Sequence, residues 1–91
     1  MKKYSLVKTD TKKTGDGKTL FRIKAKVSFG FIVKGELGGY IESSKNLADA
    51  GNAWVYGDAW VYGNARVYGN AQVYGDARVY GNAQVSGNAR V

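Results

Sequence analysis

From Gly51 onward, apolar and polar positions follow a strict period of six residues. Each repeat reads Gly, Asn or Asp, Ala, a variable residue, Val and usually Tyr, as in Gly51-Asn52-Ala53-Trp54-Val55-Tyr56. Gly recurs at positions 51, 57, 63, 69, 75, 81 and 87. Because Ala and Val are two residues apart, they point to the same side of an extended segment. The pattern predicts one short strand in every repeat.

Each strand is expected to end in a corner, because Gly followed by Asn or Asp is typical of turns. A helix is disfavoured, since a Gly at every sixth position costs about 1 kcal/mol each and the apolar period does not fit 3.6 residues. Antiparallel hairpins lack their usual two-residue loops between longer strands. Identical strands and corners are instead expected to stack in parallel, at about 4.8 Å per coil.

This repeat resembles the hexapeptide repeat of left-handed parallel β-helices, in which three repeats form a coil of about 18 residues. Val takes the aliphatic position and Ala the small one, while Tyr replaces the Gly that is common in enzymes of this kind. Asp58 and Asp76, the acidic corner residues of the repeats from Gly51, are 18 residues apart, in agreement with such a coil. Left-handedness is implied by the resemblance alone.

The residues before the repeats have a different pattern. Residues 3–9 and 19–27 are predicted strands; in the second, alternate apolar residues are separated by Arg22, Lys24 and Lys26, so one face is buried and one is basic. A β-helix exposes strand edges and apolar interior at its first coil unless something covers them. We therefore predict an all-β chain in which a small N-terminal β-sheet caps the first coil.

Charge divides the chain at the same place. Residues 1–45 contain eleven Lys and Arg and four acidic residues, whereas residues 46–91 contain three Arg and three Asp. The prediction is a basic β cap over 1–45 and a neutral hexapeptide β-helix over 46–91, folded as one unit. The basic face either keeps the protein soluble or meets nucleic acid or an acidic protein.

A more specific resemblance covers nearly the whole chain. The segment 21–25 (FRIKA), the run KGELGGYIES at 34–43, Asn46-Leu47 and the first repeat at 51–57 are similar to YdcK-type hexapeptide-repeat proteins, especially their short phage and prophage versions. The resemblance implies the β-helix and a phage origin. It implies little about activity.

Composition argues against catalysis. The chain has no His and no Cys, which excludes disulfides, thiol nucleophiles, zinc fingers and triads that depend on His. Hexapeptide acyltransferases use a catalytic His near a subunit boundary, and here no other residue supplies a base near neutral pH. Asp58 and Asp76 are too few for Ca²⁺, which takes about 6–8 oxygen ligands, so corner hydrogen bonds are favoured for them. We expect no enzyme activity, cofactor or metal.

The 18-residue coil predicts which outward side chains stack. Tyr56 is expected above Tyr74, Tyr62 above Tyr80, Tyr68 above Ser86, Trp54 above Gln72 and Arg90, Arg66 above Gln84, and Trp60 above Arg78 with a cation–π contact. These ladders either stabilise neighbouring coils or bind a partner. Trp54 and Trp60 pack against the cap or meet a partner. The candidate partner-binding residues are Trp54, Tyr56, Trp60, Tyr62, Arg66, Tyr68, Arg78, Arg22, Lys24 and Lys26.

The last coil predicts a second interface. Its strand edges invite pairing with another chain, and two-fold docking would cover both open ends. We expect a homodimer with the C-terminal coils end to end, through Val79, Tyr80, Val85, Arg90 and Val91.

Together these features predict a non-catalytic phage-type interaction protein that binds a host protein or protein complex, with inhibition of a host defence complex as its sharpest form. One alternative is a structural β-helix module of an assembly. Another is nucleic-acid binding through the basic face with aromatic stacking. No apolar stretch follows the N-terminal lysines and none approaches the roughly 20 residues of a membrane helix, so no membrane association and a cytoplasmic location are expected.

Overall fold

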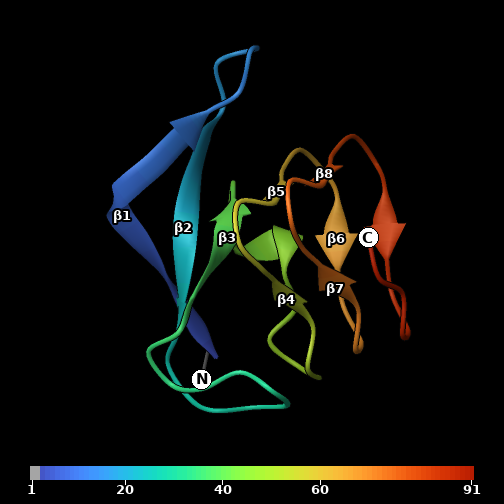
Figure 1. The fold of residues 1–91 in the computed structure, drawn as a ribbon. Helices are drawn as coiled ribbons and strands as arrows, with labels where there is room; N and C mark the ends of the chain where they lie inside the picture. The colour runs from blue at the N-terminus through green and yellow to red at the C-terminus, as the bar shows by residue number, and fades with distance from the viewer. Residues whose placement is uncertain (1–2) are drawn as a thin grey trace.

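The computed structural model describes residues 3–91, which form β-strands, turns and loops with a single short 3₁₀ turn (Figure 1). The longer elements are β1 (Tyr4–Lys13), β2 (Thr19–Ala25), β3 (Leu37–Ile41) and the 3₁₀ turn η1 (Ser44–Asn46). The repeats contribute β4 (Trp54–Val55), β5 (Trp60–Val61), β6 (Arg66–Val67), β7 (Gln72–Val73), β8 (Arg78–Val79) and β9 (Gln84–Val85). Within residues 3–91, no helix is long and apolar enough to cross a membrane.

The strands of the repeats pair in parallel, each with the strand three repeats later. β4 pairs with β7, β5 with β8 and β6 with β9, and Gln72 forms a further parallel bridge with Arg90. The register places residue 54 beside 72 and residue 60 beside 78. The predicted parallel stacking and the coil of three hexapeptides are confirmed.

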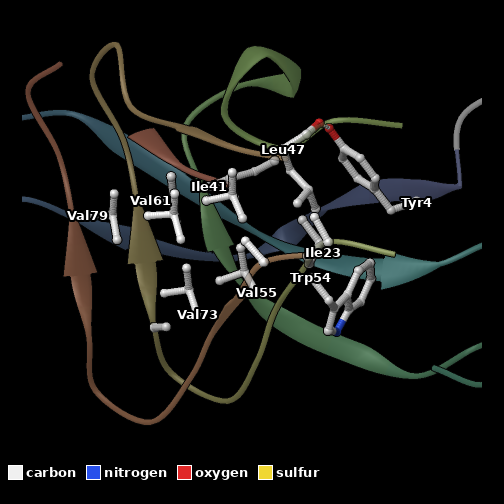
Figure 2. Close-up of a cluster of buried hydrophobic side chains, with 14 of the residues drawn as sticks. Tyr4, Ile23, Ile41, Leu47, Trp54, Val55, Val61, Val73 and Val79 are labelled. Carbon is white, nitrogen blue, oxygen red and sulfur yellow. Dashed lines mark hydrogen bonds between the residues drawn. The ribbon is translucent and has the colours of Figure 1, made fainter. Parts of the chain in front are cut away.

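Ala and Val of the first four repeats fill the interior of the coils, and Figure 2 shows several of these Val side chains. The side chains of Val55, Val61, Val67 and Val73 are fully buried, so each contributes about 1.5–3 kcal/mol of hydrophobic stabilisation. The corners require Gly: at Gly51, φ is 75° and a Cβ would collide with the carbonyl oxygen of the corner one coil further on. The sequence period thus sets both the core and the corners.

The N-terminal strands form a sheet that continues into the coil. β1 and β2 form an antiparallel hairpin, β2 pairs antiparallel with β3, and β3 pairs in parallel with β5, giving the strand order β1-β2-β3-β5-β8. β3 lies so close to the first repeats that a Cβ on Gly39 would be 2.6 Å from the carbonyl oxygen of Ala59. The sheet therefore continues across the predicted boundary between residues 45 and 46. β3 precedes this boundary and β5 follows it, and the two strands are paired.

The entry to the repeats is longer than a regular coil. Tyr40 pairs with Trp60 and Leu47 with Val67, so the offset here is two residues more than in the repeats. The extra residues lie between Leu47 and Trp54, because Trp54 already pairs with Gln72 at the regular offset. Just before them, the buried Asn46 holds η1 in place. Asn46 Oδ1 accepts hydrogen bonds from the backbone N–H groups of Glu42 (3.1 Å) and Ser43 (2.9 Å).

Candidate functional site

A row of four side chains crosses the outer face of the five-stranded sheet. The strand registers place Arg22 of β2 beside Tyr40 of β3, Tyr40 beside Trp60 of β5, and Trp60 beside Arg78 of β8. Because directly paired residues project from the same side of a sheet, cations and aromatic rings alternate along this row. Two cation–π contacts follow: Arg22 lies 4.5 Å from the centre of the Tyr40 ring, and Arg78 lies 4.3 Å from that of Trp60.

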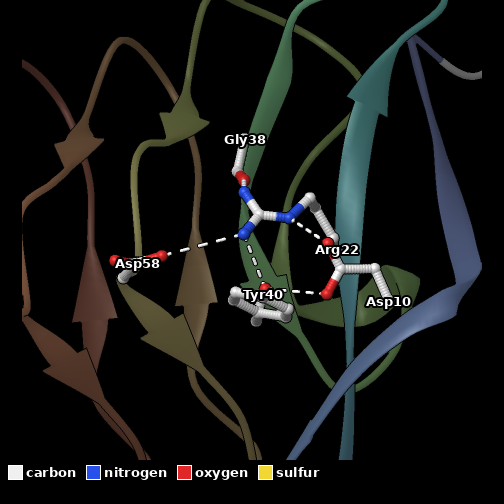
Figure 3. A network of polar contacts seen from close by, with 5 residues as sticks. All are labelled: Asp10, Arg22, Gly38, Tyr40 and Asp58. Carbon is white, nitrogen blue, oxygen red and sulfur yellow. Dashed lines mark hydrogen bonds and ion pairs between the residues drawn. The ribbon is translucent and has the colours of Figure 1, made fainter.

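Arg22 is the centre of a polar network at one end of the row (Figure 3). Its Nε donates to Asp10 Oδ2 at 2.6 Å, its Nη2 to the Tyr40 hydroxyl at 2.6 Å and its Nη1 to the Gly38 carbonyl at 2.9 Å. Asp58, at a corner of the repeats, lies 3.7 Å from Nη2. The Tyr40 hydroxyl in turn donates to Asp10 Oδ1 at 2.9 Å. One guanidinium thus joins β1, β3 and the first coil.

The network keeps its members in fixed charge states. Hydrogen bonds from Tyr40 and Arg22 lower the pKa of Asp10, so this carboxylate is ionised at neutral pH. Burial, followed by the hydrogen bond to Asp10, raises the pKa of Tyr40. For Arg22, burial opposes the charge but the hydrogen bonds to Asp10 and Tyr40 outweigh it, so its pKa is raised. These groups position one another and leave no base free near neutral pH.

The other end of the row is an aromatic cluster. The Tyr62 and Tyr80 rings stack with centroids 5.4 Å apart and an interplanar angle of 12°. Trp60 meets Tyr62 edge to face, with centroids 6.4 Å apart. The predicted Trp60–Arg78 contact and the Tyr62–Tyr80 stack are therefore confirmed. Tyr80 remains 59% exposed, so this end of the row offers an accessible ring.

Basic side chains extend the same face along β2 beyond Arg22. Lys24 follows Arg22 by two residues on β2 and is exposed, as is Lys26. Together with Lys34 and Ser5 they surround a shallow hollow of about 560 Å³. We name the surface formed by these lysines and the accessible part of the row the cation–aromatic face; its residues are Arg22, Lys24, Lys26, Trp60, Tyr62, Arg78 and Tyr80.

Trp54 requires a correction, because it was predicted among the partner-binding residues and is fully buried. The N-terminal segment covers it: the Phe29 ring lies 5.4 Å and the Tyr4 ring 6.5 Å from it, both edge to face. Figure 2 shows Trp54 beside Tyr4 at the edge of the core. Of the two predicted roles for this residue, packing against the N-terminal segment is the one found. The coil interior itself contains Ala and Val.

The remaining predicted partner-binding residues lie on other faces. Arg66 and Tyr68 belong to the β6–β9 side, where the Tyr68 hydroxyl donates to Gln84 Oε1 at 3.2 Å. Tyr56 is half-buried on the β4–β7 side and lines a hollow with Gln72 and Arg90. The predicted ten residues therefore do not form one surface, since the three sides of the coil separate them.

The predicted dimer residues are also divided. Val79 and Val85 point into the coil and are only 5% and 7% exposed, so they offer little surface on the sides of the coil. Tyr80, Arg90 and Val91 are exposed. Whether two chains meet at this end stays a prediction.

One member of the row and one member of its polar network were not predicted from the sequence. Asp10 and Tyr40 had no signal of their own, because their roles depend on how β1 and β3 align with β2. Phe31 was also missed, although it is 91% exposed. One indication of its exposure was present in the sequence: Phe31 is an apolar residue that lies between two glycine-containing turns in an otherwise basic segment.

The face presents planar cations and aromatic rings side by side. Over residues 3–91, no group of three or more acidic residues, the ligand types present here, is placed to hold a metal ion. The described row has neither an activated nucleophile nor a general base, and Arg, Tyr and Trp are the residues most enriched at binding hot spots.

Comparison with known proteins supports the assignment of the repeats. A family described as the YdcK Beta solenoid repeat matches residues 59–72, 71–85 and 83–91. No curated protein matches the chain. The resemblance before residue 59 lies outside the matched stretches and stays a prediction. Residues 59–91 are thus similar to the YdcK β-solenoid repeat, which supports a YdcK-type assignment of the repeats.

Proposed function

We propose that this chain is a non-catalytic interaction protein that binds a macromolecular partner through the cation–aromatic face. The observation that carries the proposal is that strand register and two cation–π contacts fix the accessible Arg22, Trp60 and Arg78, with Arg22 held against the buried Tyr40 ring. The row is preorganised, so little side-chain entropy is lost when a partner binds. The net charge of +7 favours an acidic partner.

The partner proposed is a host protein or protein complex, in its sharpest form a defence complex that the chain inhibits. The phage origin and the location in the cytoplasm of a host cell rest on the resemblance to short YdcK-type phage proteins. Arg78 and Tyr80 support a protein partner, because both are exposed and of the types that dominate binding energy at protein interfaces.

A matched pair of double variants tests the face. Arg78→Glu with Tyr80→Ala changes the proposed surface, whereas Arg66→Glu with Tyr68→Ala makes the same changes at equivalent repeat positions on another side. Tagged wild-type chain is used to capture proteins from bacterial lysate, with its own mass measured by light scattering. We expect one stoichiometric protein to be captured by the wild type and by the Arg66 control but not by the Arg78 variant. Equal capture by both variants would reject this face.

The same experiment separates the alternatives. Nucleic-acid binding is supported by the exposed lysines beside Arg22, and it predicts recovery of nucleic acid with an affinity that falls steeply with salt. A structural module predicts open-ended association with nothing captured. Either result would replace the protein-inhibitor proposal.

We further propose that the coil is left-handed and that two chains dock through their last coils. Handedness is supported by the resemblance of the repeat, and docking by the exposed Tyr80, Arg90 and Val91 at that end. A crystal structure tests the handedness. Light scattering of Val91→Asp tests the docking: a dimeric wild type and a monomeric variant are expected, and a monomeric wild type would contradict it.

A further inference from the structure

A second surface lies on the β4–β7 side, separate from the cation–aromatic face. It is a hollow of about 460 Å³ lined by Phe31, Tyr56, Gln72, Tyr74 and Arg90, which we name the Phe31 hollow. Its residues come from the loop after β2 and from three successive coils. The proposed function does not use it.

The most unusual feature of the hollow is Phe31. Its side chain is 91% exposed, although exposure of a phenyl ring to water is unfavourable. It stands in a tight turn closed by two backbone hydrogen bonds, from Phe29 N–H to Ile32 C=O (3.0 Å) and from Ile32 N–H to Phe29 C=O (2.7 Å). Gly30 in this turn has a φ of 51°, which suits Gly.

The base of the turn is anchored on both sides, so Phe31 is held in place. Ile32 is 3% exposed, and Phe29 packs on Trp54 with ring centroids 5.4 Å apart. The Lys3 ammonium lies 4.6 Å from the centre of the Phe29 ring. A rigid turn that presents an exposed ring is typical of a preorganised apolar contact.

The residues that line the hollow follow one another along the coil axis, and Arg90 is the charged residue among them. Tyr56 belongs to the first coil, Gln72 and Tyr74 to the second and Arg90 to the third, because Trp54 pairs with Gln72 and Gln72 with Arg90. Burial and then the charge of Glu36 raise the pKa of Tyr56, while the charge of Arg90 partly opposes them. Among residues 3–91, Arg90 has no carboxylate within ion-pair distance.

We propose that the Phe31 hollow binds a partner peptide segment in which an apolar side chain is next to a carboxylate. The apolar side chain packs between Phe31 and Tyr74, and the carboxylate pairs with the Arg90 guanidinium, which is otherwise unpaired. Charge complementarity therefore places the acid beside Arg90. Gln72, between these positions, supplies an amide donor and acceptor for the peptide backbone.

Fluorescence anisotropy with short labelled peptides tests this site. The probe is a fluorescein-labelled Gly-Asp-Phe-Glu-Gly peptide, compared with peptides in which Asn and Gln replace the acids or Ser replaces Phe. We expect only the parent peptide to bind well. Arg90→Gln and Phe31→Ser are each expected to weaken its binding about tenfold, because each removes one charged or apolar contact. Both residues are exposed, so the variants should fold.

Arg66→Gln is the control, since it removes the same charge on another side of the coil. The proposal is overturned if the parent peptide does not bind, or if Arg66→Gln weakens binding as much as Arg90→Gln. A (dT)₁₀ oligonucleotide is tested in the same way. If its binding depends on Phe31 but it does not compete with the peptide, the peptide is bound elsewhere and the proposal is overturned. A dimer that dissociates on Phe31→Ser would instead show that a second copy of the chain fills the hollow. None of these outcomes depends on the cation–aromatic face.

Discussion

At the scale of single residues, Lys3 shows how the N-terminal segment is attached to the coil. Its Nζ donates hydrogen bonds to the carbonyl oxygens of Ala53 (2.8 Å) and Gly51 (3.2 Å), and the residue is only 5% exposed. Burial lowers its pKa to about 8, and the charge of Asp49 only partly opposes this. A buried ammonium therefore holds the first repeat corner.

This pKa predicts a pH dependence of stability. Between about pH 8 and 10.5, the unfolded chain retains the Lys3 proton that the folded chain has released, so the free energy of unfolding rises with pH. Tyr4 acts in the opposite direction only above pH 10, because burial and then Asp49 raise its pKa from 10.0 to about 12. We expect the Tm of the wild type to rise between about pH 7.5 and about pH 9.5.

Differential scanning calorimetry of two charge-matched variants checks this expectation. Lys3→Met should lose the rise in Tm, whereas Lys13→Met, which removes an exposed lysine, should keep it. An equal rise in both variants would show that the effect comes from other groups.

At the scale of elements, Asn46 controls how the chain enters the repeats. Its Nδ2 donates to the carbonyl oxygens of Ala65 (2.8 Å) and Gly63 (3.3 Å), while its Oδ1 accepts from two backbone N–H groups before η1. One fully buried amide thus connects the irregular entry to the next coil. Its side chain replaces the backbone hydrogen bonds by which a regular repeat pairs with the next coil.

Asn46→Ala is predicted to reduce the free energy of unfolding by about 3 kcal/mol, because it leaves several buried backbone groups unpaired. Asn64→Ala removes an exposed amide and is expected to change stability by less than about 0.5 kcal/mol. Urea denaturation of both variants measures the difference. A loss of similar size in the two would mean that the entry turn does not depend on Asn46.

The same entry explains what could be predicted from the sequence. The period of six made the partners of Trp60 and Tyr62 predictable, because Arg78 and Tyr80 occupy the same repeat positions one coil later. Tyr40 pairs with Trp60 at an offset that the repeat does not contain, since extra residues lie between Leu47 and Trp54, and its place in the row required the structure. The burial of Trp54 likewise depends on a loop that returns from outside the repeats.

At the scale of the whole molecule, the sheet β1-β2-β3-β5-β8 is shared by the N-terminal hairpin and the coil. The core is also shared, because Tyr4 and Ile23 of the N-terminal strands belong to the same buried cluster as Val55 and Val61 (Figure 2). A common sheet and a common core couple the two parts energetically. We therefore predict that the hairpin and the repeats unfold in one cooperative transition.

A single-tryptophan variant tests this cooperativity. In Trp60→Phe, the fluorescence of Trp54 reports the contact with the N-terminal segment, while far-UV circular dichroism reports the strands of both parts together. The two denaturation midpoints are expected to coincide. Adding Tyr4→Phe removes the hydroxyl that donates to the Leu47 (2.8 Å) and Ser44 (3.1 Å) carbonyls, and it should lower both midpoints equally. Midpoints that differ, or a circular dichroism transition in two steps, would mean that the N-terminal sheet and the repeats unfold separately.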